Sequence, residues 1–277
     1  MTLISVLQLG RIDYPTGLRL QQRLVELRKD ARIGDVLLLL EHTPVITLGR
    51  NAKSANIIAS PERLAERGVE VFECDRGGDV TFHGAGQIVG YPIFDLRGMP
   101  SAEEKRKTVG AVEYVRRLEE VLIRTCADFG IPTKRISGLT GVWTTTEPAG
   151  DDTSVRPSEQ PPSSGEAKIA ALGVHISRAV TSHGFALNVN TDLSYFNLII
   201  PCGITSKPVT SIAKELGKEI PLQQVAHSLS RNVGVVFQSQ ILWLESLDDL
   251  LKTSVGVPLR VPDNLRELHK EEDIFRA

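Results

Sequence analysis

Two residues of this sequence have side chains and neighbours that suit nucleophilic attack on a carbonyl carbon. Cys202 stands between a proline and a glycine, in a turn after an apolar segment, where a side chain can project. The thiolate is the attacking species, and a free thiol with a pKa of about 8.5 is mostly protonated at neutral pH. Lys168 begins an apolar run, and its ammonium group would favour the thiolate if the two side chains lay close together. Taken alone, each has a plainer interpretation, as a small buried cysteine and as a surface lysine at a strand start.

A glycine-rich stretch, Arg76–Gln87, contains four glycines and His83 and leads into an apolar run. Glycine lets the backbone approach another group closely, so this stretch is a candidate wall for a bound ligand. A hairpin turn is the simpler interpretation of the glycines alone. The stretch lacks the Gly-Lys-Ser/Thr ending of a phosphate-binding loop, and no helical pattern follows it.

These features combine with three downstream segments: Lys168–Ile176, Ser182–Val189 and Pro201–Ile204. Together they resemble the octanoyltransferases of lipoate biosynthesis, the lipoyl(octanoyl) transferases, which belong to the biotin/lipoate protein ligase superfamily. The resemblance covers most of the chain, from about Leu40 to Leu216, with one interruption. Ala85 departs from the pattern, because the family commonly has proline there.

The resemblance implies a role for each matched residue. Cys202 would be the nucleophile that carries the acyl group, and Lys168 would be its partner. Apart from the resemblance, the setting of His183 in Ser-His-Gly suggests that it would line the site as an assisting residue. The implied substrate-binding residues are Arg76, Gly77, Gly78, Asp79, Val80, Thr81, Phe82, His83, Ala171, Leu172, Gly173, Gly184, Phe185 and Ala186.

The implied activity is transfer of an octanoyl group from octanoyl-acyl carrier protein to a lysine of a lipoyl domain, through a cysteine thioester. The acceptors would be the lipoyl domains of 2-oxoacid dehydrogenase complexes and the glycine cleavage H protein. Thioester to amide runs downhill, so no cofactor and no ATP are expected. The alternatives are an ATP-dependent lipoate- or biotin-protein ligase, a thiol hydrolase that uses Cys202, and a non-catalytic module that binds the carrier protein.

Composition excludes other classes of function. A net charge of −2 gives no reason to expect nucleic acid or an anionic membrane as partner. The longest apolar run, Val36–Leu40, is far shorter than a membrane-spanning helix. Three widely spaced cysteines indicate a reducing compartment, and no Cys-x-x-Cys or His-x-x-x-His pair offers a zinc site. No secretory signal is apparent. A monomer is expected.

Hydrophobic periodicity predicts the elements that would position these residues. Helices are expected over Pro15–Lys29, after the Ser60 cap, from a capping box at Ser101 to about Phe129, and over Leu222–Gln238. Thr2–Leu9 reads as an edge strand. Lys168–Ile176 and Phe185–Val189 read as an antiparallel pair joined through residues 177–184. Strands outnumber helices, which predicts an α+β fold. The expected fold is a single domain with mixed, largely antiparallel sheets flanked by helices, and the resemblance implies that it is biotin/lipoate-ligase-like.

The domain organisation is expected to be simple. Residues 1–245 would form the catalytic domain, and residues 246–277 a C-terminal extension on the surface. Residues 144–165 are rich in Thr, Pro, Ser, Glu and Asp without periodicity, which predicts a disordered insertion. Such an insertion favours a eukaryotic source and therefore a mitochondrial location, whereas a bacterial source would imply the cytoplasm.

Overall fold

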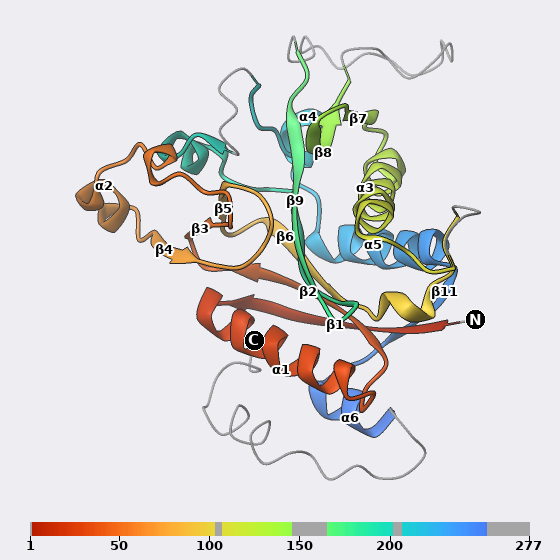
Figure 1. The fold of residues 1–277 in the computed structure, drawn as a ribbon. Coiled ribbons are helices and arrows are strands. Elements are labelled where there is room, and N and C mark those ends of the chain that lie inside the picture. Colours follow the sequence, from red (N-terminus) through yellow and green to blue (C-terminus); the bar gives the residue numbers. More distant parts are fainter. Residues whose placement is uncertain (1, 103–106, 146–164, 202–206, 254–277) are drawn as a thin grey trace, which may run out of the picture.

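The computed structural model describes residues 2–102, 107–145, 165–201 and 207–253 (Figure 1). Its strands are β1 (Thr2–Ile12), β2 (Asp35–His42), β3 (Val45–Leu48), β4 (Glu70–Glu73), β5 (Val80–His83), β6 (Gln87–Ile93), β7 (Thr133–Ile136), β8 (Leu139–Thr144), β9 (Lys168–Ser177), β10 (Val180–Asn188) and β11 (Ser239–Trp243). Its helices are α1 (Tyr14–Lys29), α2 (Pro61–Glu66), α3 (Ala111–Asp128), α4 (Ile212–Leu216), α5 (Leu222–Phe237) and α6 (Leu247–Thr253). Three short 3₁₀ helices are η1 (Ser54–Asn56), η2 (Leu96–Gly98) and η3 (Leu193–Leu198).

In the described part of the chain, the strands form two mixed sheets. The larger has the order β11-β1-β2-β6-β10-β9-β8-β7, and the smaller has the order β4-β3-β5. Antiparallel pairs predominate, with parallel pairing only between β1 and β11, β1 and β2, and β3 and β4. The expectation of an α+β fold with largely antiparallel mixed sheets is confirmed.

Helices cover both faces of the large sheet (Figure 1). Helices α3 and α5 pack on one face, where Leu118, Val121, Leu229 and Val233 are completely buried. Helix α1 packs on the other face through Leu20, Leu24 and Leu27. The predicted helix over residues 15–29 is therefore confirmed, and its spacing of leucines is the apolar stripe that meets the sheet.

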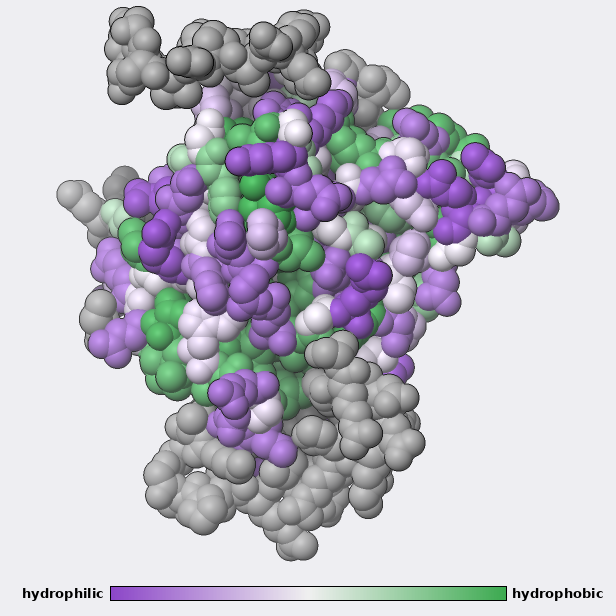
Figure 2. Space-filling model, turned by 180° about the vertical axis from the view of Figure 1, so that it is seen from behind, coloured by the Kyte–Doolittle hydropathy of each residue, from purple (hydrophilic) through white to green (hydrophobic). Residues whose placement is uncertain are grey.

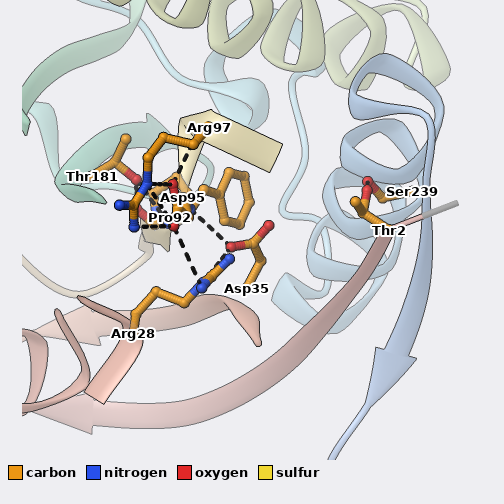
Figure 3. A network of polar contacts seen from close by, with 9 residues as sticks. Thr2, Arg28, Asp35, Pro92, Asp95, Arg97, Thr181 and Ser239 are labelled. Atoms are coloured by element: carbon orange, nitrogen blue, oxygen red, sulfur yellow. Dashed lines mark hydrogen bonds and ion pairs between the residues drawn. The ribbon is translucent and has the colours of Figure 1, made fainter. Parts of the chain in front are cut away.

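A buried polar network joins helix α1 to the sheet (Figure 3). The Arg28 guanidinium contacts Asp35 at 2.8 Å and Asp95 at 3.7 Å, and the Asp95 backbone N–H donates to the same Asp35 carboxylate. Burial raises the pKa of Asp35 above its usual value, although Arg28 opposes the shift. Thr181 on β10 donates to the Pro92 carbonyl on β6. The end of α1 is therefore held by charge as well as by packing.

The long helix α3 begins later than the sequence predicts. It starts at Ala111 with Gly110 as its N-cap, whereas the capping box predicted a start at Ser101. The Ser101 hydroxyl donates to the Glu113 carboxylate at 2.6 Å, and Glu113 lies in the first turn of α3. The sequence had predicted that Ser101 would cap a helix together with Glu104. Glu104 itself lies outside the described residues.

Two predictions about the ends of the fold are wrong. Strand β1 is not at the edge, because β11 pairs with it in parallel from Thr2↔Ser239 to Val6↔Trp243. The segment after Ser246 does not begin as a surface tail, because α6 buries Leu247 and Leu250 against the core beneath α1. Residues 254–277 lie outside the described part of the chain.

The predicted insertion also has a different start. Thr144 is the last residue of β8 and is buried, and its backbone N–H donates a hydrogen bond to the Ala167 carbonyl. Residues 146–164, on which the expectation of disorder falls, lie outside the described residues.

A lobe containing α2 and the small sheet projects from the body (Figure 1). From behind, this lobe is covered mainly by hydrophilic side chains (Figure 2). As predicted, Ser60 caps α2, since its hydroxyl accepts from the Arg63 backbone N–H at 3.3 Å. No helix in the described part of the chain has both the length and the apolar character needed to cross a membrane.

Candidate functional site

A cavity of about 470 Å³ lies between the glycine-rich loop before β5 and the paired strands β9 and β10. It is lined by Tyr14, Arg76, Gly78, Asp79, Thr81, His83, Val89, Tyr91, Ala171, Leu172, Gly173, His183, Gly184, Phe185 and Ala186. Glycine and apolar residues make up more than half of this lining, and a few polar groups converge on it. Such a cavity suits a flexible hydrocarbon chain with one polar end.

The Arg76 guanidinium holds the glycine-rich loop in shape. Its side chain is buried, and Nη2 donates to the carbonyls of Thr47 and Asp79, each at 2.7 Å. Nη1 donates to the Gly77 carbonyl at 3.1 Å. Because these acceptors are neutral backbone carbonyls, the loop is fixed while a positive charge stays beside the cavity.

Contact between the loop and strand β9 depends on Gly173. The Gly77 N–H donates to the Val174 carbonyl at 2.9 Å. A Cβ atom added at Gly173 would lie 2.5 Å from the Gly77 carbonyl oxygen, which is closer than atoms can approach without a shift. The absence of a side chain at Gly173 therefore lets the loop sit directly on β9 and close the cavity.

Two buried histidines beside the cavity are neutral. His83 donates from Nδ1 to the Gln87 side-chain oxygen at 2.7 Å, because the Gln87 amide already donates to the Phe82 carbonyl. His42 contacts the Ile12 carbonyl through Nδ1, so its Nε2 accepts from the Tyr91 hydroxyl at 2.7 Å. Burial lowers the pKa of His83 to about 3 and that of His42 to about 4. Neither ring can be charged at neutral pH, so neither supplies a cation to a thiolate.

His183 lies at the end of the cavity in a strained backbone conformation, with φ 55°. Its backbone N–H donates to the Gln21 side-chain oxygen at 2.8 Å, and its ring Nε2 lies 2.7 Å from an Asp75 carboxylate oxygen. The other Asp75 oxygen is 3.6 Å from His175 Nδ1, so His175 takes part in the same polar cluster. Burial lowers the pKa of His183, although Asp75 opposes the shift.

Lys168 is buried at the start of β9, with 5% of its surface exposed. Its Nζ lies 4.7 Å from the centre of the Trp143 ring on β8, within the range of a cation–π contact. Gly141 on the same strand leaves room for the lysine stem, since a Cβ there would lie 3.3 Å from Lys168 Cε. The contact with the Trp143 ring and the close packing around its stem hold this buried ammonium in place.

The backbone of Lys168 is tied to the chain just after Cys202. Its N–H donates to the Pro208 carbonyl and its carbonyl accepts from the Thr210 N–H, each at 2.9 Å. Pro208 follows Cys202 by only six positions in the sequence. Cys202 itself lies outside the described residues, and its expected role as nucleophile stays a prediction.

The structure brings most of the predicted substrate-binding residues to one cavity, but not all. Gly77, Val80 and Phe82 do not line it. Val80 and Phe82 are buried in the small-sheet core, where the Phe82 ring stacks on Tyr195 at 4.6 Å between centroids, because alternate residues of β5 point to opposite faces. Cys126, expected to be a small buried hydrophobe, is fully buried on α3, and burial raises the pKa of its thiol to about 12.

Sequence reasoning missed three lining residues: Tyr14, Val89 and Tyr91. Alternation along the strand after the glycine-rich stretch could have found Val89 and Tyr91, which share one face of β6. Tyr14 gave no local signal, because it is the first residue of α1 and meets the cavity only through tertiary packing. Its buried hydroxyl makes no hydrogen bond to any described residue.

Comparison with curated proteins finds similar chains named octanoyltransferase. The relative from Koribacter versatilis is 59% identical over 270 residues, covering 98% of this chain and 98% of its own. The relative from Acidobacterium capsulatum is 56% identical over 250 residues, covering 90% and 96%. Both are bacterial, so the expectation of a mitochondrial location, which depended on the low-complexity segment, is not supported.

Solved structures agree in fold. A lipoate-protein ligase A bound with ATP is 13% identical with a TM-score of 0.63, covering 99% of this chain and 96% of that one. A lipoate protein ligase from T. acidophilum is 14% identical with a TM-score of 0.61, covering 96% and 94%. The profile of the lipoyl protein ligase A/B catalytic domain matches residues 13–234. The chain belongs to the lipoyl protein ligase A/B catalytic domain family, among its octanoyltransferases.

Proposed function

We propose that this acyltransferase moves an octanoyl group from octanoyl-acyl carrier protein to a lysine of a lipoyl domain, through a thioester on Cys202. The acceptors are the lipoyl domains of 2-oxoacid dehydrogenase complexes and the glycine cleavage H protein. Because the relatives are bacterial, the bacterial alternative applies, and the cytoplasm is the proposed compartment.

The cavity beside β9 is the observation that carries this proposal. Its lining of glycine, alanine and single large apolar residues suits an eight-carbon chain, which gains roughly 0.8 kcal/mol for each buried methylene. Lys168, at the start of the same strand, supplies a buried ammonium, and its backbone is bonded to the segment that follows Cys202. A hydrocarbon site and a cation near the nucleophile are what thioester exchange requires.

The first step acylates the enzyme. The Cys202 thiolate attacks the thioester carbon of the donor, and the oxyanion that forms collapses to break the bond to the carrier sulfur. The proton for the leaving thiolate comes from the Lys168 ammonium. Backbone N–H groups of the glycine-rich loop, other than that of Gly77, which donates to Val174, would stabilise the oxyanion.

The second step releases the product. The neutral amine of the acceptor lysine attacks the octanoyl-Cys202 thioester, and the bond to the Cys202 sulfur breaks to give an amide. The amine loses one proton, which returns to Lys168, and Cys202 is again a thiolate. Neither of the two acyl-transfer steps requires a nucleotide.

Trapping the intermediate tests the proposal. Intact-mass spectrometry after mixing with octanoyl-acyl carrier protein, without ATP, should show one octanoyl group on the wild-type chain. Cys202→Ser should show none, and Cys74→Ser, which changes a partly buried thiol just after β4, should still be acylated. Acylation that survives Cys202→Ser would reject the assignment of the nucleophile. Turnover of free lipoate only with ATP would support a ligase instead.

A further inference from the structure

A second hollow, separate from the cavity beside β9, lies next to the residues that flank Cys202 in the sequence. It is an open groove of about 1100 Å³ between η3 and the segment from Lys207 to Val209, and Pro201 forms part of its wall. Pro208, which bonds the backbone of Lys168, also lines it. Pro208 therefore connects the wall of the groove directly to the backbone of Lys168, the proposed catalytic lysine.

Its surface combines exposed apolar groups with positive charge. Ile58 is 58% exposed, which is unusual for a large aliphatic side chain, and it faces the groove beside Ile200. Lys207 and Lys214 are the charged residues among its described lining, which includes no Asp or Glu. Lys207 shares the Glu166 carboxylate with Lys134, whereas Lys214 is exposed on α4. The free charge of the groove is thus carried mainly by Lys214.

We propose that this groove binds the phosphopantetheine arm of the acyl donor, with Lys214 contacting the phosphate and Ile58 packing on the arm. The inference rests on the proposed function and names the part of the donor that the second hollow takes. An extended arm with an anionic end matches an open apolar groove with a cation, and its thioester end would be directed toward Lys168. The acceptor lysine is itself a cation at neutral pH, so the positive charge of Lys214 would repel it.

The test uses two small donors that differ only in the phosphate: octanoyl-phosphopantetheine and octanoyl-pantetheine. Acylation of Cys202 in the full chain is followed in single turnovers while the donor concentration is varied. The wild-type chain should reach half-saturation at about 3- to 10-fold lower concentration of the phosphorylated donor. Lys214→Glu should abolish this preference without changing the rate at saturation. Lys218→Glu, a charge reversal near the same helix but outside the groove, should retain the preference.

Ile58 gives a second readout. Ile58→Ser should raise the half-saturating concentration of both donors about 3-fold, whereas Val112→Ser, which removes a 72% exposed valine on α3, should raise neither. The proposal is overturned if Lys214→Glu keeps the phosphate preference, or if the variants slow only the transfer to a lipoyl domain. Wild-type chain that takes no octanoyl group from any donor would instead overturn the proposed function itself.

Discussion

At the scale of single residues, the chemistry depends on where one positive charge lies. His42 and His83 are buried and neutral, and burial also lowers the pKa of His183. Lys168 rests on the face of Trp143 at the start of β9, and its backbone is hydrogen-bonded to Pro208 and Thr210. Because the His42 and His83 rings carry no charge at neutral pH, they favour the proposal that Lys168 supplies the cation for Cys202.

Replacing Lys168 should change the pH dependence of acylation. In Lys168→Met, the Cys202 thiol loses its cationic partner and ionises unaided, near the free value of about 8.5. Acylation at pH 7 should fall by about 100-fold or more, and the rate should rise about tenfold per pH unit until the thiol titrates. Stopped-flow acylation between pH 6 and pH 10 measures this profile.

A lysine outside the site provides the comparison. Lys134→Met removes a half-exposed lysine of β7 that pairs with Glu166 at 2.7 Å, and its profile should match the wild type. A Lys168→Met rate that is uniformly low at every pH would contradict the thiolate role. It would indicate instead that the lysine acts only by supporting the fold.

Sequence predicted the identity of most site residues but not their neighbours. The glycine-rich stretch and the two strand segments matched the family pattern residue by residue, and the structure gathers most of them around one cavity. Trp143 gave no sign of its contact with Lys168, and Tyr14 none of its place in the wall, because both contacts join elements far apart in the chain. Phe82 was misplaced because family matching does not say which face of a strand a residue occupies.

At the scale of elements, the site is a contact between a loop and a strand without an intervening side chain. The glycine-rich loop sits on β9 where Gly173 leaves space. On β10, a Cβ atom added at the neighbouring Gly184 would lie 2.2 Å from the Gly90 carbonyl oxygen of β6. The loop can therefore sit directly on β9 only while position 173 carries no side chain, whereas the bare backbone at Gly184 allows the close approach of β6.

Gly173→Ala should therefore impair activity more than stability. The added methyl must displace the Gly77 carbonyl, which costs about 1–3 kcal/mol and shifts the loop that lines the cavity. Urea unfolding should show a modest loss of stability, while the half-saturating concentration of the octanoyl donor rises. Gly34→Ala is a matched control, because an added Cβ there meets nothing within 4 Å. An unchanged donor affinity in Gly173→Ala would show that the loop does not form the acyl wall.

Element boundaries were predictable where the local signal matched the tertiary contact. Helix α1 ends at Lys29 as predicted, and α5 lies within one residue of the predicted span. Helix α3 begins at Ala111 and not at Ser101 as predicted, and the Ser101 side chain donates to Glu113 in the first turn of that helix. Strand β11 was missed since it is short, follows a helix directly and is defined only by its pairing with β1.

At the scale of the whole molecule, buried neutral histidines make stability depend on pH. An unfolded histidine has a pKa near 6.5, whereas burial lowers the pKa of His42 to about 4 and of His83 to about 3. The unfolded chain binds more protons below pH 6.5, so their contribution is complete above that pH. It is lost as the pH falls toward the folded values.

The free energy of unfolding should therefore fall between pH 6.5 and pH 4, by about 1.4 kcal/mol per pH unit for each of these two histidines. Urea titrations at a series of pH values measure the slope. His42→Gln should reduce it by about 1.4 kcal/mol per pH unit, even if the variant is less stable throughout. His227→Gln, which changes an exposed histidine of α5, should leave it unchanged. An equal slope in His42→Gln would mean that this ring is already protonated in the folded chain.

The pairing of β1 with β11 has a consequence for synthesis. Thr2 and Ser239 share a hydrogen bond across 237 positions, so one edge of β1 stays unpaired until β11 has been synthesised. Until residue 243 emerges, one border of the nascent sheet offers open backbone groups to any other chain in the same condition. Because this edge is completed late, we expect the nascent polypeptide to bind chaperones. We also expect the yield of folded protein to depend on how fast β11 is translated.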